Sequence, residues 1–253
     1  MGIDAEFGDV EHRFATYADR DSVEAEMPYG ARAIPRTLYE LLTFAVETHA
    51  SRPALSFQIL SDPGAPSETL TWRELHGRTT QAANLFRRLG VGPGDTVAYL
   101  LPNCSETVAV LMGGAVAGIV NPINPLLEAE QIAAILRETR AKVLVTLRSF
   151  PKTDVAQKAA AAVKFAPNVK TVLEVDLLRY LTGAKRLLVP LLRPKNKLAH
   201  HADVLDFTAE AAREPADALT FDDPKEDRIA AYFHTGGTTG LPKIAQHRYS
   251  GMI

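Results

Sequence analysis

Gly92-Pro-Gly-Asp-Thr-Val-Ala-Tyr-Leu-Leu101 decides the fold, because it joins a tight turn to a continuous apolar run. Its first four residues predict a chain reversal, since glycine and proline are the residues that turns favour. The run at 96–101 lacks the polar/apolar alternation of a half-exposed strand, and it is typical of a strand covered on both faces. We therefore expect this run to form a central strand of a buried sheet.

Helical and strand patterns alternate on both sides of this strand. Thr37-Leu-Tyr-Glu40 and Thr71-Trp-Arg-Glu74 have the capping-box pattern that begins a helix, and Gly90 follows the second helical pattern as a terminator. The order β-α-β-α-β-α-β predicts an α/β fold, with a parallel sheet flanked by helices on both faces. Further strands are predicted at 54–60 and 67–71 as a hairpin, at 119–120, 142–147, 169–175 and 228–233, and further helices from 104 to about 118, at 128–139 and at 153–165.

Composition limits the classes of protein to consider. The 253 residues are 46% apolar and carry a net charge of −2, which suits a globular chain and gives no field that would recruit nucleic acid. The acidic amino terminus does not resemble a secretory signal, and the thirteen-residue apolar run at 108–120 is too short for a membrane span. We expect a cytoplasmic location.

A second stretch carries chemistry: Tyr232-Phe-His-Thr-Gly-Gly-Thr-Thr-Gly-Leu-Pro-Lys-Ile-Ala-Gln-His247. Glycines let backbone amides approach an anion closely, threonines add hydroxyl donors, and a lysine adds a mobile positive charge. An expected strand at 228–233 and a helix starting near Gln246 place this anion site at the carboxyl end of a strand, where open α/β sheets bind ligands. The expected phosphate-binding residues are Thr235, Gly236, Gly237, Thr238, Thr239, Gly240 and Lys243.

The simplest alternative is that this loop only reverses the chain. The Walker pattern is absent, because Pro242 rather than glycine precedes the lysine. However, Thr-Gly-Gly-Thr-Thr-Gly-Leu-Pro-Lys resembles the signature loop of the adenylate-forming (AMP-binding) superfamily, whose usual form is Thr-Ser-Gly-Thr-Thr-Gly-x-Pro-Lys-Gly. Gly236 stands at the serine position and Ile244 at the last glycine, which leaves the phosphate-binding residue types in place.

Other blocks extend the resemblance from about residue 37 to the end of the sequence. They are Thr71-Trp-Arg-Glu-Leu, Leu89-Gly-Val-Gly-Pro-Gly-Asp-Thr-Val-Ala, Leu101-Pro-Asn-Cys-Ser-Glu and Gly118-Ile-Val-Asn-Pro-Ile-Asn-Pro. The resemblance implies that residues 37–253 are the amino-terminal part of the large domain of an adenylate-forming enzyme, preceded by a polar extension at 1–36. It also implies that the carboxyl-terminal domain, with its catalytic lysine, lies in residues that this sequence does not include.

The resemblance is strongest to acyl-CoA synthetases, acid–thiol ligases that use ATP, Mg²⁺ and coenzyme A. It implies a carboxylic-acid substrate, such as a fatty acid or a related acid, and acyl-adenylate and thioester formation. It places no catalytic residue and no metal ligand in this part, so we expect residues 1–253 alone to be inactive. The alternatives are another adenylating enzyme, such as a peptide-synthetase adenylation domain, a phosphate- or nucleotide-binding module without catalysis, or a structural partner in an assembly.

A basic, leucine-rich segment at 176–201 interrupts the alternation. We expect a peripheral insertion whose leucines pack on the sheet while its charges stay in water. Weak peripheral contact of residues 176–198 with an anionic membrane is the alternative.

We expect structural rather than catalytic or metal-binding roles for the single cysteine and for three of the histidines. Cys104, the only cysteine, is expected to be a small core residue rather than a nucleophile. His200 and His201 are adjacent and would point apart, so they do not form a metal site. His247 is expected at the start of a helix rather than as a catalytic base.

Overall fold

The computed structural model describes residues 15–27, 31–194, 199–235 and 243–253. The chain divides into two units, Met1–Ile34 and Pro35–Ile253. The first unit contains α1 (Tyr17–Glu26), which begins with a capping box between Thr16 and Asp19 and has no buried residue. The expected amino-terminal extension at 1–36 therefore includes a helix that its polar composition did not reveal.

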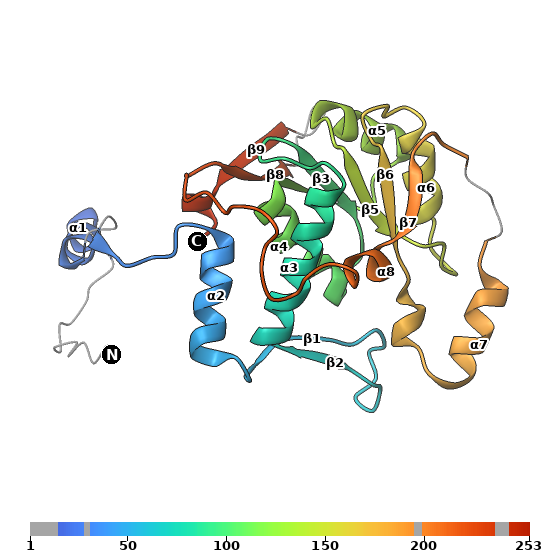
Figure 1. Ribbon diagram of the computed structural model, residues 1–253, viewed down its shortest axis with the longest axis horizontal. Coiled ribbons are helices and arrows are strands. Elements are labelled where there is room, and N and C mark those ends of the chain that lie inside the picture. The colour runs from blue at the N-terminus through green and yellow to red at the C-terminus, as the bar shows by residue number, and fades with distance from the viewer. Residues whose placement is uncertain (1–14, 28–30, 195–198, 236–242) are drawn as a thin grey trace. The chain divides into compact units, whose positions relative to one another are not determined.

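A seven-stranded sheet organises the second unit, with the strand order β7-β6-β5-β3-β4-β8-β9 (Figure 1). All adjacent pairs are parallel except β8 and β9, which are antiparallel, so the sheet is mixed rather than wholly parallel. The strands are β3 (Thr96–Leu100), β4 (Ile119–Pro122), β5 (Val143–Leu147), β6 (Thr171–Val175), β7 (Asp203–Asp206), β8 (Ile229–Thr235) and β9 (Lys243–Arg248). A separate hairpin joins β1 (Pro53–Phe57) to β2 (Glu68–Thr71), as expected.

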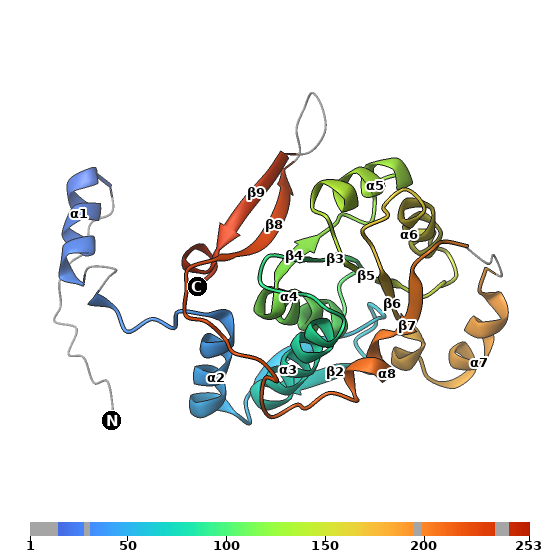
Figure 2. The ribbon, with the colours of Figure 1, turned by 45° about the horizontal axis from the view of Figure 1, so that its top comes forward.

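Helices cover both faces of the sheet, which confirms the expected α/β architecture (Figure 2). On one face α3 packs against α4, and on the other α5 packs against α6. The helices of this unit are α2 (Leu38–His49), α3 (Trp72–Arg88), α4 (Ser105–Ala117), α5 (Ala129–Glu138), α6 (Val155–Val163), α7 (Gly183–Leu192) and α8 (Phe207–Ala211).

Two neighbouring strands in the interior of the sheet, β3 and β5, are buried along their whole length and pair in parallel, with Ala98 opposite Leu144. Burial on both faces removes the need for polar side chains, which explains their continuous apolar sequences. Helix α3 begins where its sequence predicts, because Thr71 and Glu74 form the reciprocal capping box.

The turn from α4 into β4 depends on Gly118. A Cβ atom there would lie 2.5 Å from the carbonyl oxygen of Asp95 and 2.8 Å from that of Gly92. Because both obstacles are backbone atoms, no rotamer change could relieve the clash. The close approach fixes the start of β4 beside β3 and so sets the place of β8 in the sheet.

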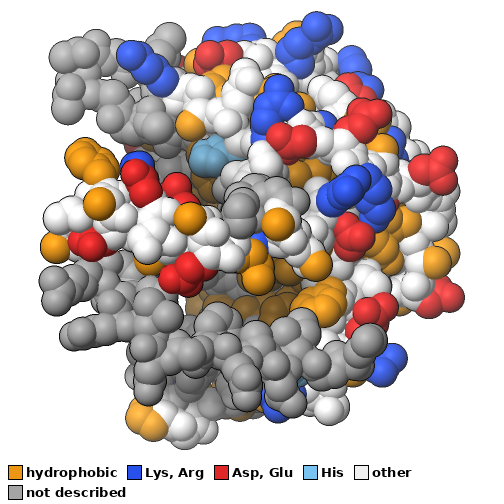
Figure 3. Space-filling model, turned by 90° about the vertical axis from the view of Figure 1, so that its left-hand side faces the viewer, with side chains coloured by type: hydrophobic (Ala, Val, Ile, Leu, Met, Phe, Trp, Pro, Cys, Tyr) orange, Lys and Arg blue, Asp and Glu red, His pale blue; other side chains and the backbone are white. Residues whose placement is uncertain are grey.

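Basic and acidic side chains are interspersed on the face of the larger unit drawn in Figure 3, in keeping with the near-neutral charge of the chain. None of the helices in the described ranges is long and apolar enough to cross a membrane.

Candidate functional site

The expected phosphate loop connects two antiparallel strands at the edge of the sheet. Strand β8 ends at Thr235 and β9 begins at Lys243, and these two residues are paired across the hairpin. Strand β8 also lies parallel to β4, with Val120 opposite Ala231. The expected site residues Gly236, Gly237, Thr238, Thr239 and Gly240 lie outside the described residues. The structure thus sets the two ends of the loop.

The expected helix near Gln246 is wrong, because this segment is strand β9. His247 therefore lies within a strand, and its ring meets that of Phe233 edge to face at a centroid distance of 5.0 Å. The physical reason is pairing with β8: backbone hydrogen bonds across the hairpin satisfy the groups that a helix would satisfy internally. The sequence of residues 243–248 alone contains no signal that identifies β8 as their partner.

Arg228 and Tyr249 anchor the end of the hairpin opposite to the loop. The Arg228 guanidinium donates hydrogen bonds to the carbonyl oxygens of Ala115 at 2.7 Å, Val116 at 2.9 Å and Gly118 at 2.6 Å. These carbonyls end α4, where no intrahelical partner remains and a cation is favoured by the helix dipole. Tyr249 is fully buried, and its hydroxyl donates to Ala115 at 2.9 Å.

A second tie lies one residue before the loop. The side chains of His234 in β8 and Asn121 in β4 are 3.1 Å apart, and Asn121 is fully buried. Burial lowers the pKa of His234 below its ordinary value of 6.5, which favours the neutral ring. The two ties hold β8 at both ends, so the loop starts from a fixed frame.

A cavity of about 880 Å³ lies beside the hairpin. It is lined from the hairpin by Tyr232, Lys243, Ile244 and Gln246, and from the main sheet and its helix ends by Gly94, Asp95, Thr96, Glu138, Thr139, Arg140, Lys142, Asn168 and Lys170. Among these lining residues four are basic and two are acidic, so the wall is net positive and suits an anion. Lys142 and Asp95 form an ion pair of 2.6 Å within it.

The position of this cavity differs from that of the expected site. Thr96 begins β3, and Lys142 and Lys170 each precede a strand, so these residues belong to the amino edge of the sheet. The expected site lies instead at the carboxyl end of β8. Among the seven expected site residues, Lys243 contributes to the described lining of the cavity.

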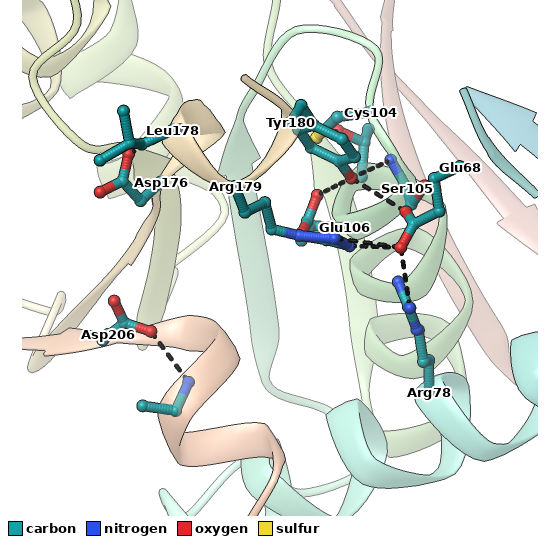
Figure 4. Close-up of polar contacts among 12 residues, drawn as sticks. Glu68, Arg78, Cys104, Ser105, Glu106, Asp176, Leu178, Arg179, Tyr180 and Asp206 are labelled. Atoms are coloured by element: carbon teal, nitrogen blue, oxygen red, sulfur yellow. Dashed lines mark hydrogen bonds and ion pairs between the residues drawn. The ribbon is translucent and has the colours of Figure 1, made fainter. Parts of the chain in front are cut away.

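Sequence reasoning missed a partly buried charged cluster formed by Glu68, Arg78, Glu106, Arg179 and Tyr180 (Figure 4). Arg179 lies 2.7 Å from both the Glu68 and the Glu106 carboxylates, and the Tyr180 hydroxyl donates to Glu106 at 2.7 Å. Arg78 reaches Glu68 at 2.9 Å. The cluster joins β2, α3, the amino end of α4 and the 3-10 helix η2 (Leu177–Tyr180) that follows β6. Glu68 and Arg179 are 111 positions apart, so no local motif reveals the pairing.

The charges in this cluster compensate one another. Burial pushes the pKa of Glu68 upward, but the hydrogen bond from Arg78 and the charge of Arg179 outweigh it and leave the pKa below its ordinary value. Burial, together with its hydrogen bond to Glu106, raises the pKa of Tyr180, which keeps the phenol protonated. The Tyr180 phenol that stays a donor and the Glu68 carboxylate that stays charged make this cluster a structural tie between elements.

Cys104 lies beside this cluster as the N-cap residue of α4 and is only 3% exposed. Burial raises the pKa of its thiol to about 11, which disfavours the thiolate needed for nucleophilic attack. The expectation that Cys104 packs in the core agrees with this burial.

Residues 42–253 match the model of the family described as AMP-binding enzyme. Marinolic acid–CoA ligase from Pseudoalteromonas sp. (strain SANK 73390) is 30% identical over 247 residues, covering 97% of this chain and 34% of the relative. Long-chain-fatty-acid–CoA ligase from Bacillus subtilis (strain 168) is 29% identical over 225 residues, covering 86% and 37%. The chain spans about a third of the length of these curated relatives.

Solved structures show the same fold. Acetoacetyl-CoA synthetase from Streptomyces lividans superimposes with a TM-score of 0.67 and 25% identity, over 85% of this chain and 31% of that one. An anthranilate–CoA ligase in complex with anthranoyl-AMP gives a TM-score of 0.67 at 20% identity, over 88% of this chain and 36% of that one.

Proposed function

Because the chain belongs to the AMP-binding enzyme family, we propose that it is part of an enzyme that activates a carboxylic acid with ATP and passes the acyl group to coenzyme A. The observation that carries this proposal is the hairpin whose two strands end at Thr235 and Lys243, the ends of the expected phosphate loop. The family match includes the whole hairpin. The ligase names of the relatives support the acid–thiol ligase reaction, and a fatty acid or related acid is the proposed substrate class.

In the proposed reaction a carboxylate oxygen attacks the α-phosphorus of ATP while the bond to pyrophosphate breaks. The thiolate of coenzyme A then attacks the acyl carbonyl carbon, and AMP leaves as the thioester forms. Residues 235–243 act on the leaving group: amides and hydroxyls, with the ammonium of Lys243, spread the charge that builds on pyrophosphate. They bind and orient, and none of them forms a covalent intermediate.

The frame of the hairpin supports this role. Arg228 and Tyr249 hold its base to α4, and the His234–Asn121 contact holds β8 one residue before the loop. A loop that starts from fixed ends loses less conformational freedom on closing around phosphates than a loop between mobile ends. The strands thus pre-organise Thr235 and Lys243 at the two ends of the loop.

Mg²⁺ accompanies ATP in the proposed reaction. Within the part of the chain that the structure describes, no three His, Cys, Asp or Glu side chains gather in a group that could hold a metal ion. In the proposed enzyme, the protein ligands of Mg²⁺, the adenine pocket and a catalytic lysine belong to other residues of the longer polypeptide.

A kinetic experiment tests the loop in the enzyme that contains this chain. Lys243→Ala and Thr238→Ala are each expected to lower kcat/KM for ATP. The loss corresponds to about 1 to 3 kcal/mol of transition-state stabilisation, with little change in KM for the carboxylic acid. Lys164→Ala, at an exposed position after α6, serves as the matched control and should leave both constants unchanged. Unchanged ATP kinetics in both single variants and in the double variant would remove the phosphate role from this loop.

Pyrophosphate exchange with residues 1–253 alone separates the proposed enzyme from a self-contained site. We expect no acid-dependent exchange above a control without protein. Exchange that depends on added fatty acid would show a complete adenylation site within these residues. ATP binding by residues 1–253 without exchange would fit the binding-module alternative only if the longer enzyme were inactive as well.

A further inference from the structure

Helix α7 presents leucines to the outside. Leu187 and Leu191 are each 75% exposed, Leu192 is 65% exposed and Leu188 is 52% exposed, and none of the ten residues of α7 is buried. The expectation that the leucines of this segment pack on the sheet is therefore wrong for these four. It holds for Leu177 and Leu181, which are buried.

The exposed leucines form one face. Together with Ala184 they occupy positions i, i+3, i+4, i+7 and i+8 of α7, the spacing that gathers side chains into a single stripe. An amphipathic helix of a globular protein normally turns such a stripe inward. Here a contiguous apolar face points outward, which marks an interaction surface rather than scattered surface leucines.

The arginines that flank α7 hold this orientation. Arg179, before the helix, belongs to the partly buried cluster with Glu68 and Glu106. Arg193, directly after the helix, pairs with Asp176 at 2.5 Å, and its side chain is only 18% exposed. The segment thus pairs two of its charges with carboxylates of the fold and exposes its leucines. Because residues on both sides of α7 form ion pairs with the body of the fold, we infer that the helix and its apolar face have a defined position.

The exposed charges on α7 are basic. No acidic residue occurs between positions 177 and 202, a span that holds six lysines and arginines. Of these, Lys185 and Arg186 lie on α7 and are exposed. Lys185 lies at one border of the apolar stripe and Arg186 on the opposite side of the helix. An apolar stripe with cations on the remaining surface of the helix complements a bilayer with anionic headgroups, where the leucines meet acyl chains and the cations meet phosphates.

A hollow of about 300 Å³ extends the apolar surface at the amino end of α7. Ala184 and Lys185 line it from the helix, and Ile59, Leu60 and Pro66 line it from the turn of the β1–β2 hairpin. Since Ala184 belongs to the leucine face, the hollow and that face are continuous. Two separate elements therefore contribute apolar groups to one surface.

We propose that α7 docks this protein on an anionic membrane surface, with Leu187, Leu188, Leu191 and Leu192 entering the acyl-chain boundary and Lys185 and Arg186 at the headgroups. This docking does not depend on the ATP reaction, because it uses none of the loop residues.

Vesicle flotation tests the proposal with the 253-residue chain. The chain should float with vesicles of phosphatidylcholine mixed with phosphatidylglycerol, and added salt should release it. Changing Lys185 and Arg186 to Glu should weaken binding by at least about tenfold, because each basic residue near an anionic surface contributes about 1 kcal/mol. Leu187→Ser together with Leu191→Ser should weaken binding by about tenfold or more, because each buried CH₂ contributes about 0.8 kcal/mol.

Matched controls use exposed positions elsewhere. Leu126→Ser, at a leucine that is 82% exposed, and Lys164→Glu should leave binding unchanged. The thermal midpoint of each variant should match that of the parent, since all the changed side chains are exposed. A failure to float with anionic vesicles, or equal binding to neutral vesicles, would overturn the proposal.

Two other occupants of the leucine face of α7 would give different experimental results. Concentration-dependent dimerisation without vesicles, lost in the Leu187/Leu191 variant, would assign the face to a second copy of the chain. Protection of α7 from hydrogen exchange without vesicles, when the chain is expressed within a longer polypeptide, would assign it to an intramolecular contact. Either result would overturn membrane docking.

Discussion

The guanidinium of Arg228 and the hydroxyl of Tyr249 lie 2.7 Å apart, and both donate to the carbonyl oxygen of Ala115 near the end of α4. The two residues flank the β8–β9 hairpin in sequence, one before β8 and one after β9. Their meeting closes the base of the hairpin and attaches it to a helix of the main core. The position of the expected phosphate loop depends on this distant contact.

Loss of either partner should therefore loosen the hairpin. Tyr249→Phe removes one hydroxyl from this network and should lower the free energy of unfolding by about 1 to 3 kcal/mol. Arg228→Met should cost more, because it leaves four backbone carbonyls without this donor. Urea unfolding gives both values, with Lys164→Met at an exposed position after α6 as the control. The double variant should lose less than the sum, and strict additivity would mean that the two groups do not act together.

Gly113 lets α3 and α4 approach closely. A Cβ atom at this position would lie 2.7 Å from the Ala82 Cβ atom and 3.0 Å from the Ala83 nitrogen and the Thr79 oxygen. Overpacking of this kind costs typically about 1 to 3 kcal/mol, and it outweighs the gain of about 1 kcal/mol that alanine brings to a helix interior. Gly113→Ala should therefore lower the free energy of unfolding, whereas Gly94→Ala, with nothing within 4 Å, should not. Equal stability of the two variants would contradict the close packing.

Arg179 neutralises carboxylates that water cannot reach freely. Glu106 is only 5% exposed, so Arg179→Ala leaves a buried charge without its main partner. The expected loss is about 1 to 3 kcal/mol of unfolding free energy, because the Arg179 side chain is itself 30% exposed and the Tyr180 hydroxyl still donates to Glu106. Arg186→Ala, on the exposed face of α7, is the control and should stay within about 0.5 kcal/mol of the parent. Equal midpoints of chemical unfolding for the two variants would show that the cluster contributes nothing.

Acid should destabilise the fold in two stages. Burial lowers the pKa values of His76, His200 and His234 below the ordinary 6.5, so the unfolded chain takes up protons before the folded chain does. This contribution is complete above about pH 6.5 and decreases as the pH falls through the lower folded-state values. Glu68, whose pKa is also lowered, loses its contribution only in the acid range below 4.5.

Thermal midpoints between pH 7.5 and 5.5 measure the histidine stage. His234→Gln should flatten the decrease, because glutamine takes no proton. His49→Gln, on the exposed end of α2, should leave the decrease as it is in the parent. A midpoint that is independent of pH over this range in the parent would show that the buried histidines do not resist protonation.

The β3 and β5 strands were predictable because their signal is local. A continuous apolar run of five residues can hardly avoid burial, and capping residues such as Thr71 and Glu74 act on the backbone beside them. The sequence also indicated the family, because the loop ending at Lys243 and the blocks around it keep their order along the chain. The roles of individual loop residues in binding phosphate stay a prediction.

Contacts between residues far apart in the sequence decided the remaining features of the fold. The sequence alone determined the alternating helices and strands of the main sheet, the strand that leads into the loop and the family resemblance, because each rests on neighbouring residues. Tertiary structure made residues 243–248 a strand by pairing them with β8, placed Arg179 between Glu68 and Glu106, and turned the α7 leucines outward by tying Arg193 to Asp176. Pairing free energy between distant segments has no signature in either segment taken alone, so only the folded chain reveals it.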